Sequence, residues 1–260
     1  MTANIVVGTP LSLPTNRRSQ GTLVLVRHGE TEWNREGRLT GWDDQRLNDC
    51  GITQAAATGR ALAAAGLVFD VVFTSMLQRA MHTSTILLEA FGPRPGEIAS
   101  DWRLNERHYG VLQGHNRVSA ADHFGNRLAR HWRRDIDARP PPVNPLDPRH
   151  PGRDSRYRDV SPGLLPTSES LRDVVARVLD VWHHRVIGHL VQDRTVLVVA
   201  HTNTIRSLMH HLEEIAPEAL IDLAIPAATP LVYRFGKDPC RPVSKGVLGE
   251  MATASSSWAE

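Results

Sequence analysis

Residues 23–31 read LVLVRHGET, so an arginine and a histidine directly follow an apolar run. The run predicts a buried strand, which places Arg27 and His28 at its carboxyl end, where open α/β sheets bind their ligands. An imidazole can act as a nucleophile, and the planar guanidinium of arginine matches two oxygens of a phosphate. The pair therefore predicts chemistry on a phosphoryl group.

Two further strand ends carry groups of the same kind. The apolar strand predicted over residues 195–200 leads to His201, and the strand predicted over 69–74 leads into a helix whose first turn holds Arg79. Neighbouring strands lie about 4.8 Å apart, so side chains at adjacent parallel strand ends can face one ligand. Each of these residues alone has an ordinary structural explanation. Together, two imidazoles and two guanidiniums predict a clamp for a phosphoryl dianion.

The elements that must position these residues alternate between strands and helices. Helices are predicted over residues 52–65, 76–90, 119–134, 168–190 and 202–213, and a late strand over 231–235. This alternation predicts a three-layer α/β/α fold with a largely parallel central sheet.

Three regions are expected along the chain. They are a flexible N-terminal tail over residues 1–20, a single catalytic domain over 21–236 and a mobile C-terminal tail over 237–260. Within the domain, the stretch of about 103–166 is rich in proline and arginine. Because loops of this length are usually functional, we expect it to be an insertion that binds the substrate.

The composition argues against several other classes of protein. The only lysines are Lys237 and Lys245, so a Gly-Lys-Ser/Thr phosphate loop cannot be built. A net charge of only +2 argues against a general attraction to nucleic acids. No apolar run approaches the roughly 18 residues that cross a bilayer, and the N-terminus is a poor signal peptide. The cysteines and histidines lack metal-ligand spacing, so we expect a cytoplasmic protein without a metal.

The residues named so far lie within a set of longer sequence motifs. They are LVLVRHGETEWNREGRLTGW at 23–42, TSMLQRAMHT at 74–83, RLNERHYGVLQG at 103–114, HWRR at 131–134, PPP at 140–142, VVAHTNTIRSL at 198–208, IP at 225–226 and PLVYRF at 230–235. In these blocks the chain resembles the histidine phosphatase superfamily and, more narrowly, the cofactor-dependent phosphoglycerate mutases. The Arg-His-Gly turn marks the superfamily, whereas the block that begins at Arg103 marks the mutase branch. The fold that this resemblance implies is phosphoglycerate mutase-like.

The resemblance also implies roles for individual residues. His28 would be the nucleophile that becomes phosphohistidine, and Arg27, Arg79 and His201 would hold the phosphoryl group.

Glu106 would carry a proton to and from the substrate oxygen. Its ordinary alternative is a surface ion pair with Arg103 or Arg107. The remaining residues implied by the resemblance would bind the phosphates and the carboxylate of the substrate. They are Asn34, Thr40, Gly41, Tyr109, Arg117, Arg133, Arg134 and Asn203.

The implied reaction interconverts 3-phosphoglycerate and 2-phosphoglycerate in glycolysis and gluconeogenesis. Phosphorylated His28 would give its phosphoryl group to 3-phosphoglycerate, and the bound 2,3-bisphosphoglycerate would then phosphorylate His28 again from its other end. The resemblance thus implies an isomerase that needs 2,3-bisphosphoglycerate as a priming donor and no metal. It also implies a homo-oligomer, either a dimer or a tetramer.

The chain departs from the mutases at positions near the expected site. Arg117 stands in place of lysine, Thr202 in place of glycine, and Ala227 and Ala228 in place of Thr-Gly, while the tail after Phe235 differs throughout. A less closed site favours hydrolysis, so the alternative is a phosphatase of phosphorylated metabolites on the same scaffold. A catalytically idle relative that binds anionic metabolites or a protein is disfavoured, because both the nucleophile and the proton carrier are present.

Overall fold

The fold is built around one six-stranded sheet in a computed structural model that describes residues 21–92, 95–236 and 238–248. Its strands are β1 (Thr22–Arg27), β2 (Val71–Thr74), β3 (Glu97–Ser100), β4 (Thr195–Ala200), β5 (Leu231–Phe235) and β6 (Pro242–Val247). They lie in the order β3-β2-β4-β1-β5-β6. The first four strands in this order are parallel, whereas β5 and β6 run antiparallel to their neighbours. The predicted three-layer α/β/α fold with a largely parallel sheet is confirmed.

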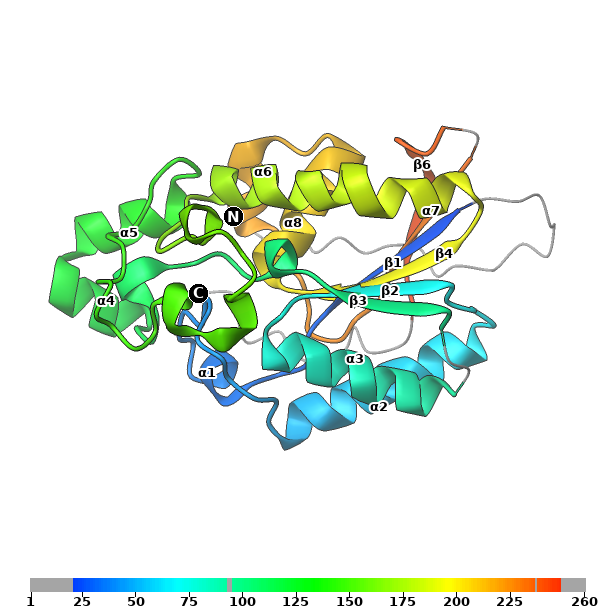
Figure 1. Ribbon diagram of the computed structural model, residues 1–260, viewed down its shortest axis with the longest axis horizontal. Helices are drawn as coiled ribbons and strands as arrows, with labels where there is room; N and C mark the ends of the chain where they lie inside the picture. Colours follow the sequence, from blue (N-terminus) through cyan, green and yellow to red (C-terminus); the bar gives the residue numbers. More distant parts are fainter. Residues whose placement is uncertain (1–20, 93–94, 237, 249–260) are drawn as a thin grey trace.

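Helices cover both faces of the sheet (Figure 1). The helices α2 (Asp49–Ala64) and α3 (Gln78–Phe91) lie on one face. The opposite face carries α6 (Leu171–Val181), α7 (Ile187–Val191) and α8 (Thr202–Glu213). This double cover explains why the central strands are almost wholly apolar, since both sides of each strand are buried.

Side chains alternate along β1 between two hydrophobic clusters. Leu23 and Leu25 pack with Trp182 on the side of α6 and α8, while Val24 and Val26 pack with the helices α2 and α3 on the other side. These four side chains of β1 are fully buried. The strand is therefore fixed in register on both faces, and so is the residue that follows it.

The inserted region lies beyond the end of the sheet, at the left of Figure 1. It contains α4 (Arg117–Phe124) and α5 (Asn126–Arg134), and the short helix α1 (Glu32–Arg35) lies nearby. Single turns connect the remaining segments: Trp102–Leu104, Gly110–Leu112, Pro151–Arg153, Ser155–Tyr157, Pro162–Leu164 and Pro217–Asp222.

Several predicted elements are wrong in detail. The single helix expected over 119–134 is two helices, because Gly125 has a φ of +83° and interrupts the hydrogen bonding. The helix expected over 168–190 begins at Leu171, after the capping box of Ser170 with Asp173, and passes through a π-helical turn at Trp182–Val186. These breaks depend on local backbone geometry that apolar periodicity does not report.

Two strands were not predicted. β3 lies at one edge of the sheet, and β6 at the other edge falls within the range 237–260 that we predicted as a mobile tail. That prediction is wrong for Pro242–Val247, which pairs with β5 and is held there by the ion pair of Lys245 with Glu213. The tail predicted over 1–20 lies outside the described residues, as does the segment after residue 248. In the part of the chain that is described, no helix is long and apolar enough to span a membrane.

Candidate active site

His28 follows the last residue of β1 and continues its pairing with β4, because its backbone N–H donates to the carbonyl of Ala200 at 3.0 Å. The Nδ1 atom of its buried ring lies 2.7 Å from the carbonyl oxygen of Gly29. A carbonyl only accepts, so Nδ1 carries the hydrogen and Nε2 keeps its lone pair. A side chain at Gly29 would place its Cβ 2.4 Å from the carbonyl oxygen of Gly51, so this turn requires glycine.

The charge state of His28 suits a nucleophile. Burial lowers the pKa of the His28 imidazole well below its usual value, and the positive charges of Arg79 and Arg27 lower it further. The ring is therefore neutral near pH 7, so Nε2 is unprotonated and carries the lone pair that a nucleophile needs.

Arg79, in the first turn of α3, is fixed by three hydrogen bonds. Its Nε donates to Nε2 of His28 at 3.3 Å, while Nη1 and Nη2 donate to the carbonyls of Asp43 at 2.9 Å and Gly41 at 2.7 Å. Burial lowers the pKa of Arg79 to about 10, so the guanidinium stays charged at neutral pH. Gly41 has a φ of +55°, and a Cβ there would lie 2.3 Å from the side chain of Gln113, so the loop that receives Arg79 also needs glycine.

His201 stands at the end of β4, next to His28, and the two ring centroids are 5.1 Å apart. Its Nε2 lies 2.7 Å from Oγ of Ser75, which also accepts a hydrogen bond from the backbone N–H of Leu77. Burial lowers the pKa of His201 well below its usual value, and the positive charge of Arg79 lowers it further. The structure thus brings two imidazoles and the Arg79 guanidinium together from three strand ends. Ser75, which orients the second imidazole, was not predicted as a site residue.

Three buried polar atoms of this region have no hydrogen-bond partner among the described residues. They are Nε of Arg27, Oγ1 of Thr40 and Nδ1 of His201. Buried polar groups are normally paired, and leaving one unpaired costs about 1–3 kcal/mol. Arg27 is held by its other end, since Nη1 donates to the carbonyl of Ile225 at 2.8 Å. These atoms suit the oxygens of an anionic ligand.

Glu106 lies in the loop between the turns Trp102–Leu104 and Gly110–Leu112. Its Oε1 accepts hydrogen bonds from the backbone N–H of Arg107 at 2.7 Å and from Nδ2 of Asn203 at 2.9 Å. The alternative of a surface ion pair is not what the structure shows. Arg103 pairs with Asp101 and Asp180, and the side chain of Arg107 donates to backbone carbonyls.

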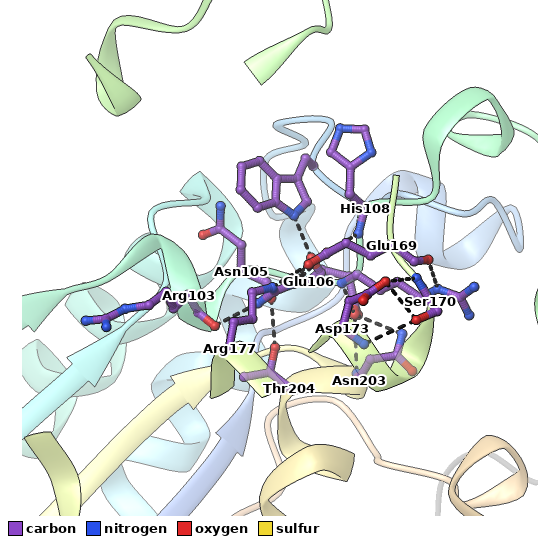
Figure 2. A network of polar contacts seen from close by, with 12 residues as sticks. Arg103, Asn105, Glu106, His108, Glu169, Ser170, Asp173, Arg177, Asn203 and Thr204 are labelled. Carbon is purple, nitrogen blue, oxygen red and sulfur yellow. Dashed lines mark hydrogen bonds and ion pairs between the residues drawn. The ribbon is translucent and has the colours of Figure 1, made fainter. Parts of the chain in front are cut away.

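Arg177 of α6 holds the loop that carries Glu106, as Figure 2 shows. Its guanidinium donates to the carbonyls of Arg103 at 2.7 Å, Asn105 at 2.8 Å and Glu106 at 2.9 Å. The same group forms a buried ion pair with Glu169 at 2.6 Å. One guanidinium thus fixes three carbonyls within four residues, a role that nothing in the local sequence marks.

Tyr109 joins this network from the same loop. Its hydroxyl lies 2.8 Å from Nδ2 of Asn203, so one amide group contacts both Glu106 and Tyr109. Burial raises the pKa of the Tyr109 phenol, which therefore remains protonated at neutral pH. The guanidinium of Arg107 lies over the Tyr109 ring, 5.3 Å from its centroid.

The predicted substrate-binding arginines are not all brought to one place. Arg133 is half-buried, and burial, followed by the positive charge of Arg117, lowers its pKa. Arg134 instead forms an exposed ion pair with Asp222 at 3.0 Å. Arg134 directly follows Arg133 in α5, and adjacent helix residues point in different directions, so the Arg134 side chain is turned away from Arg133.

Asn34 forms hydrogen bonds with a neighbour in its own short helix segment. It forms a capping box with Thr31, in which its backbone N–H donates to the Thr31 hydroxyl at 3.2 Å and its Oδ1 accepts from the Thr31 N–H at 3.3 Å. These contacts orient α1 beside the site and do not join Asn34 to the histidines.

Two departures from the mutase pattern lie beside the end of β1. Ala227 forms a bridge with Arg27, and the N–H of Ala228 donates to the Arg27 carbonyl at 2.8 Å. Ala228 has a φ of +50°, a conformation that favours glycine. Thr202, the third departure, is the half-buried first residue of α8.

The charges that gather here suit an anion. In the described ranges, no group of three His, Cys, Asp or Glu side chains is placed to hold a metal ion. The convergent groups are instead two neutral imidazoles, two guanidiniums and a hydroxyl, which together can bind a phosphoryl group and accept it on nitrogen.

Comparison with known proteins agrees with this geometry. Residues 23–246 match the profile of the Histidine phosphatase superfamily (branch 1). The chain belongs to the histidine phosphatase superfamily. A curated member, the 2,3-bisphosphoglycerate-dependent phosphoglycerate mutase of Nitratidesulfovibrio vulgaris (strain DSM 19637 / Miyazaki F), is 44% identical over 233 residues, which cover 90% of this chain and 93% of that protein.

Two solved structures share the fold. A mycobacterial glucosyl-3-phosphoglycerate phosphatase in complex with VO3 is 27% identical, with a TM-score of 0.58, and the match covers 82% of this chain and 92% of that one. A second structure, described as mycobacterial hydrolase 1, is 25% identical with a TM-score of 0.62, over 81% of this chain and 87% of that one.

Proposed function

We propose that this superfamily member is a 2,3-bisphosphoglycerate-dependent phosphoglycerate mutase that acts through phosphorylated His28. One relationship carries the proposal. Arg79 contacts Nε2 of His28 directly and also lies within electrostatic range of the Glu106 carboxylate. The nucleophile and the proton carrier therefore share one cationic site, as transfer between two hydroxyl groups requires. The 44% identity to a curated mutase supports the same function.

The chemistry follows from the atoms in place. Nε2 of His28 attacks phosphorus, so an N–P bond forms as the P–O bond to the leaving hydroxyl breaks. Arg27, Arg79 and His201 stabilise the charge that develops on the phosphoryl oxygens. Glu106 gives a proton to the leaving oxygen and takes one from the acceptor hydroxyl in the reverse half of the cycle.

The priming cofactor is 2,3-bisphosphoglycerate, which supplies the first phosphoryl group to the enzyme. The orphaned atoms of Arg27, Thr40 and His201 suit one phosphate of such a ligand. Arg133, Arg117 and the hydroxyl of Tyr109 would bind the carboxylate and the other phosphate, and the electrostatic effect of Arg117 and Tyr109 on Arg133 supports this assignment. We further propose a homo-oligomeric, cytoplasmic enzyme of glycolysis and gluconeogenesis, in line with the resemblance.

A phosphatase on the same scaffold is the second candidate. Alanine at positions 227 and 228, directly beside Arg27, favours it, as does the similarity to a solved phosphatase. In that reaction water would attack phosphohistidine in place of the substrate hydroxyl.

The test measures both reactions in one tube. The enzyme is supplied with 3-phosphoglycerate, with and without catalytic 2,3-bisphosphoglycerate, while 2-phosphoglycerate and inorganic phosphate are recorded. The mutase predicts fast isomerisation that requires the cofactor, and little phosphate. Phosphate release without isomerisation would replace the mutase with the phosphatase. The Glu106→Gln variant should lose turnover in either case, whereas Glu89→Gln, an exposed carboxylate on α3, should not.

A further inference from the structure

Arg206 of α8 lies one helical turn after Asn203 and takes no part in the mechanism described above. Its Nη1 donates to Oδ1 of Asn203 at 3.2 Å. Its Nε and Nη2 both donate to the carbonyl of Leu223, at 2.9 and 2.7 Å. The guanidinium therefore connects the Asn203 side chain to the backbone that follows the turn Pro217–Asp222.

This contact decides which way the Asn203 amide points. A guanidinium has only donors, so the amide atom that faces Arg206 must be the oxygen. The NH2 group then faces the opposite way, toward Oε1 of Glu106 at 2.9 Å and the hydroxyl of Tyr109 at 2.8 Å. An inverted amide would set its oxygen against the Glu106 carboxylate and its NH2 against the guanidinium, and both contacts would be repulsive.

The shape of the arginine side chain is what allows both contacts. Two of its nitrogens clamp one carbonyl, which fixes the plane of the guanidinium and leaves the third nitrogen directed at Asn203. A lysine has a single ammonium on a flexible chain and cannot hold both partners at fixed directions. The segment it clamps is itself anchored two residues later, where Arg27 donates to the carbonyl of Ile225.

We infer that Arg206 is a positioning residue, which holds the Asn203 amide so that its NH2 group faces Glu106 and stabilises the carboxylate form of that residue. The inference rests on the proposed function, in which Glu106 carries the proton. Other cations also act on Glu106. Arg27 and Arg79 are in electrostatic range, and Arg177 contacts its backbone carbonyl.

These other cations are unchanged when Arg206 is replaced, as are the neighbouring groups on the Glu106 loop, Arg107 and Tyr109. A comparison of variants at position 206 therefore isolates the contribution of one guanidinium. The experiment records the pH dependence of kcat and KM for the full-length enzyme and for Arg206→Met and Arg206→Lys. The matched control is Arg185→Met, whose arginine also joins two partners, Asp101 and the ring of Phe73, away from Glu106.

We expect Arg206→Met to lower kcat at neutral pH by about tenfold, with KM within about twofold of wild type. The acid limb of its kcat profile should move to higher pH by at least about half a unit, because the carboxylate has lost a fixed donor and a nearby positive charge. Arg206→Lys keeps the positive charge but loses the forked guanidinium. The acid limb of its kcat profile should therefore move less than that of Arg206→Met, and its kcat should still be reduced.

Two results would overturn the inference. One is a loss of kcat in Arg206→Met with the acid limb unmoved. The other is an equal displacement in Arg185→Met, which would mark a general effect of lost stability. Unfolding midpoints of all three variants show whether each one keeps the fold. If Arg206→Met does not fold, Arg206→Lys, which keeps a charged side chain, takes its place in the comparison. Failure of the proposed mutase is separately visible, because wild type would then release phosphate without isomerisation.

Discussion

Nε of Arg79 donates to Nε2 of His28 across 3.3 Å, so the guanidinium faces the nitrogen that attacks phosphorus in the proposed mechanism. The two residues come from different strand ends and are fixed independently, His28 by the Gly29 carbonyl and Arg79 by the carbonyls of Asp43 and Gly41. The cation is therefore placed in advance for the oxygens of a phosphoryl group bound at His28. Such preorganised charge is commonly the largest single contribution to catalysis.

Replacement of Arg79 by lysine should lower kcat/KM by at least about 100-fold, although the positive charge is kept. Lysine cannot bind two loop carbonyls and also face His28, so the charge would no longer be held at the nucleophile. Steady-state kinetics of Arg79→Lys with 3-phosphoglycerate provides the test, with the melting temperature as a control for folding. Activity close to that of wild type would show that the fork geometry is not needed.

Orthovanadate should stabilise the folded enzyme, since the unpaired atoms of Arg27, Thr40 and His201 would gain acceptors or donors from its oxygens. At a concentration 100 times its dissociation constant, a ligand adds about 2.7 kcal/mol, which corresponds to about 5–10 °C in melting temperature for a chain of this size. Differential scanning fluorimetry measures the shift. Arg79→Met should lose most of it and Arg185→Met should keep it, whereas equal shifts in both variants would place the anion elsewhere.

Stability should fall as the pH drops below about 6.5, because three buried histidines resist protonation in the folded state. Burial lowers the pKa of His28 and His201 well below the usual value, and that of His108 to about 3. The unfolded chain binds these protons below pH 6.5 and the folded chain does not. Each histidine therefore removes about 1.4 kcal/mol of stability per pH unit until its folded-state pKa is reached.

Urea unfolding between pH 6.5 and 5 measures this slope, in a range above the usual titration of carboxylates. His108→Gln should reduce the slope by the share of one histidine, and the exposed His82→Gln should leave it unchanged. A free energy of unfolding that is constant over this range would contradict the neutral, buried state assigned to these rings.

Ala228→Gly should leave the protein as stable as wild type or raise its stability by up to about 1 kcal/mol. Alanine at a φ of +50° carries a steric cost of about 1–2 kcal/mol, which exceeds the entropic cost of glycine of about 0.5–1 kcal/mol. Ala56→Gly within α2 is the matched exchange and should lower stability by up to about 1 kcal/mol. Chemical denaturation of both variants is the measurement, and an equal loss in each would show that the backbone at Ala228 is not strained.

The parts of the fold that could be predicted from the sequence are those set by local pattern. The apolar runs of β1 and β4 predict buried strands because both faces are covered, and the residues at their ends follow directly. The edge strands β3 and β6 have mixed sequences, EIAS and PVSKGV, and form only because a neighbouring strand offers its backbone. Such pairing is a tertiary effect that propensity does not capture.

The same division holds within the site. His28 and Arg79 could be predicted because strand ends and a family pattern mark them. Ser75, Arg177 and Arg206 act on groups that are distant in sequence or that only the fold orients, so no spacing reveals them. Arg134 was predicted beside the substrate, but its ion pair with Asp222 depends on the placement of a turn far along the chain.

The most direct test is to locate the phosphoryl group on the enzyme. Brief incubation of the protein with isotopically labelled 2,3-bisphosphoglycerate, followed by mass spectrometry and phosphorus NMR under alkaline conditions, identifies the modified atom. We predict one label per active site, on Nε2 of His28, which is absent in His28→Ala, retained in His82→Ala and discharged by 3-phosphoglycerate. Label on any other residue, or mutase turnover in His28→Ala, would contradict the phosphohistidine mechanism.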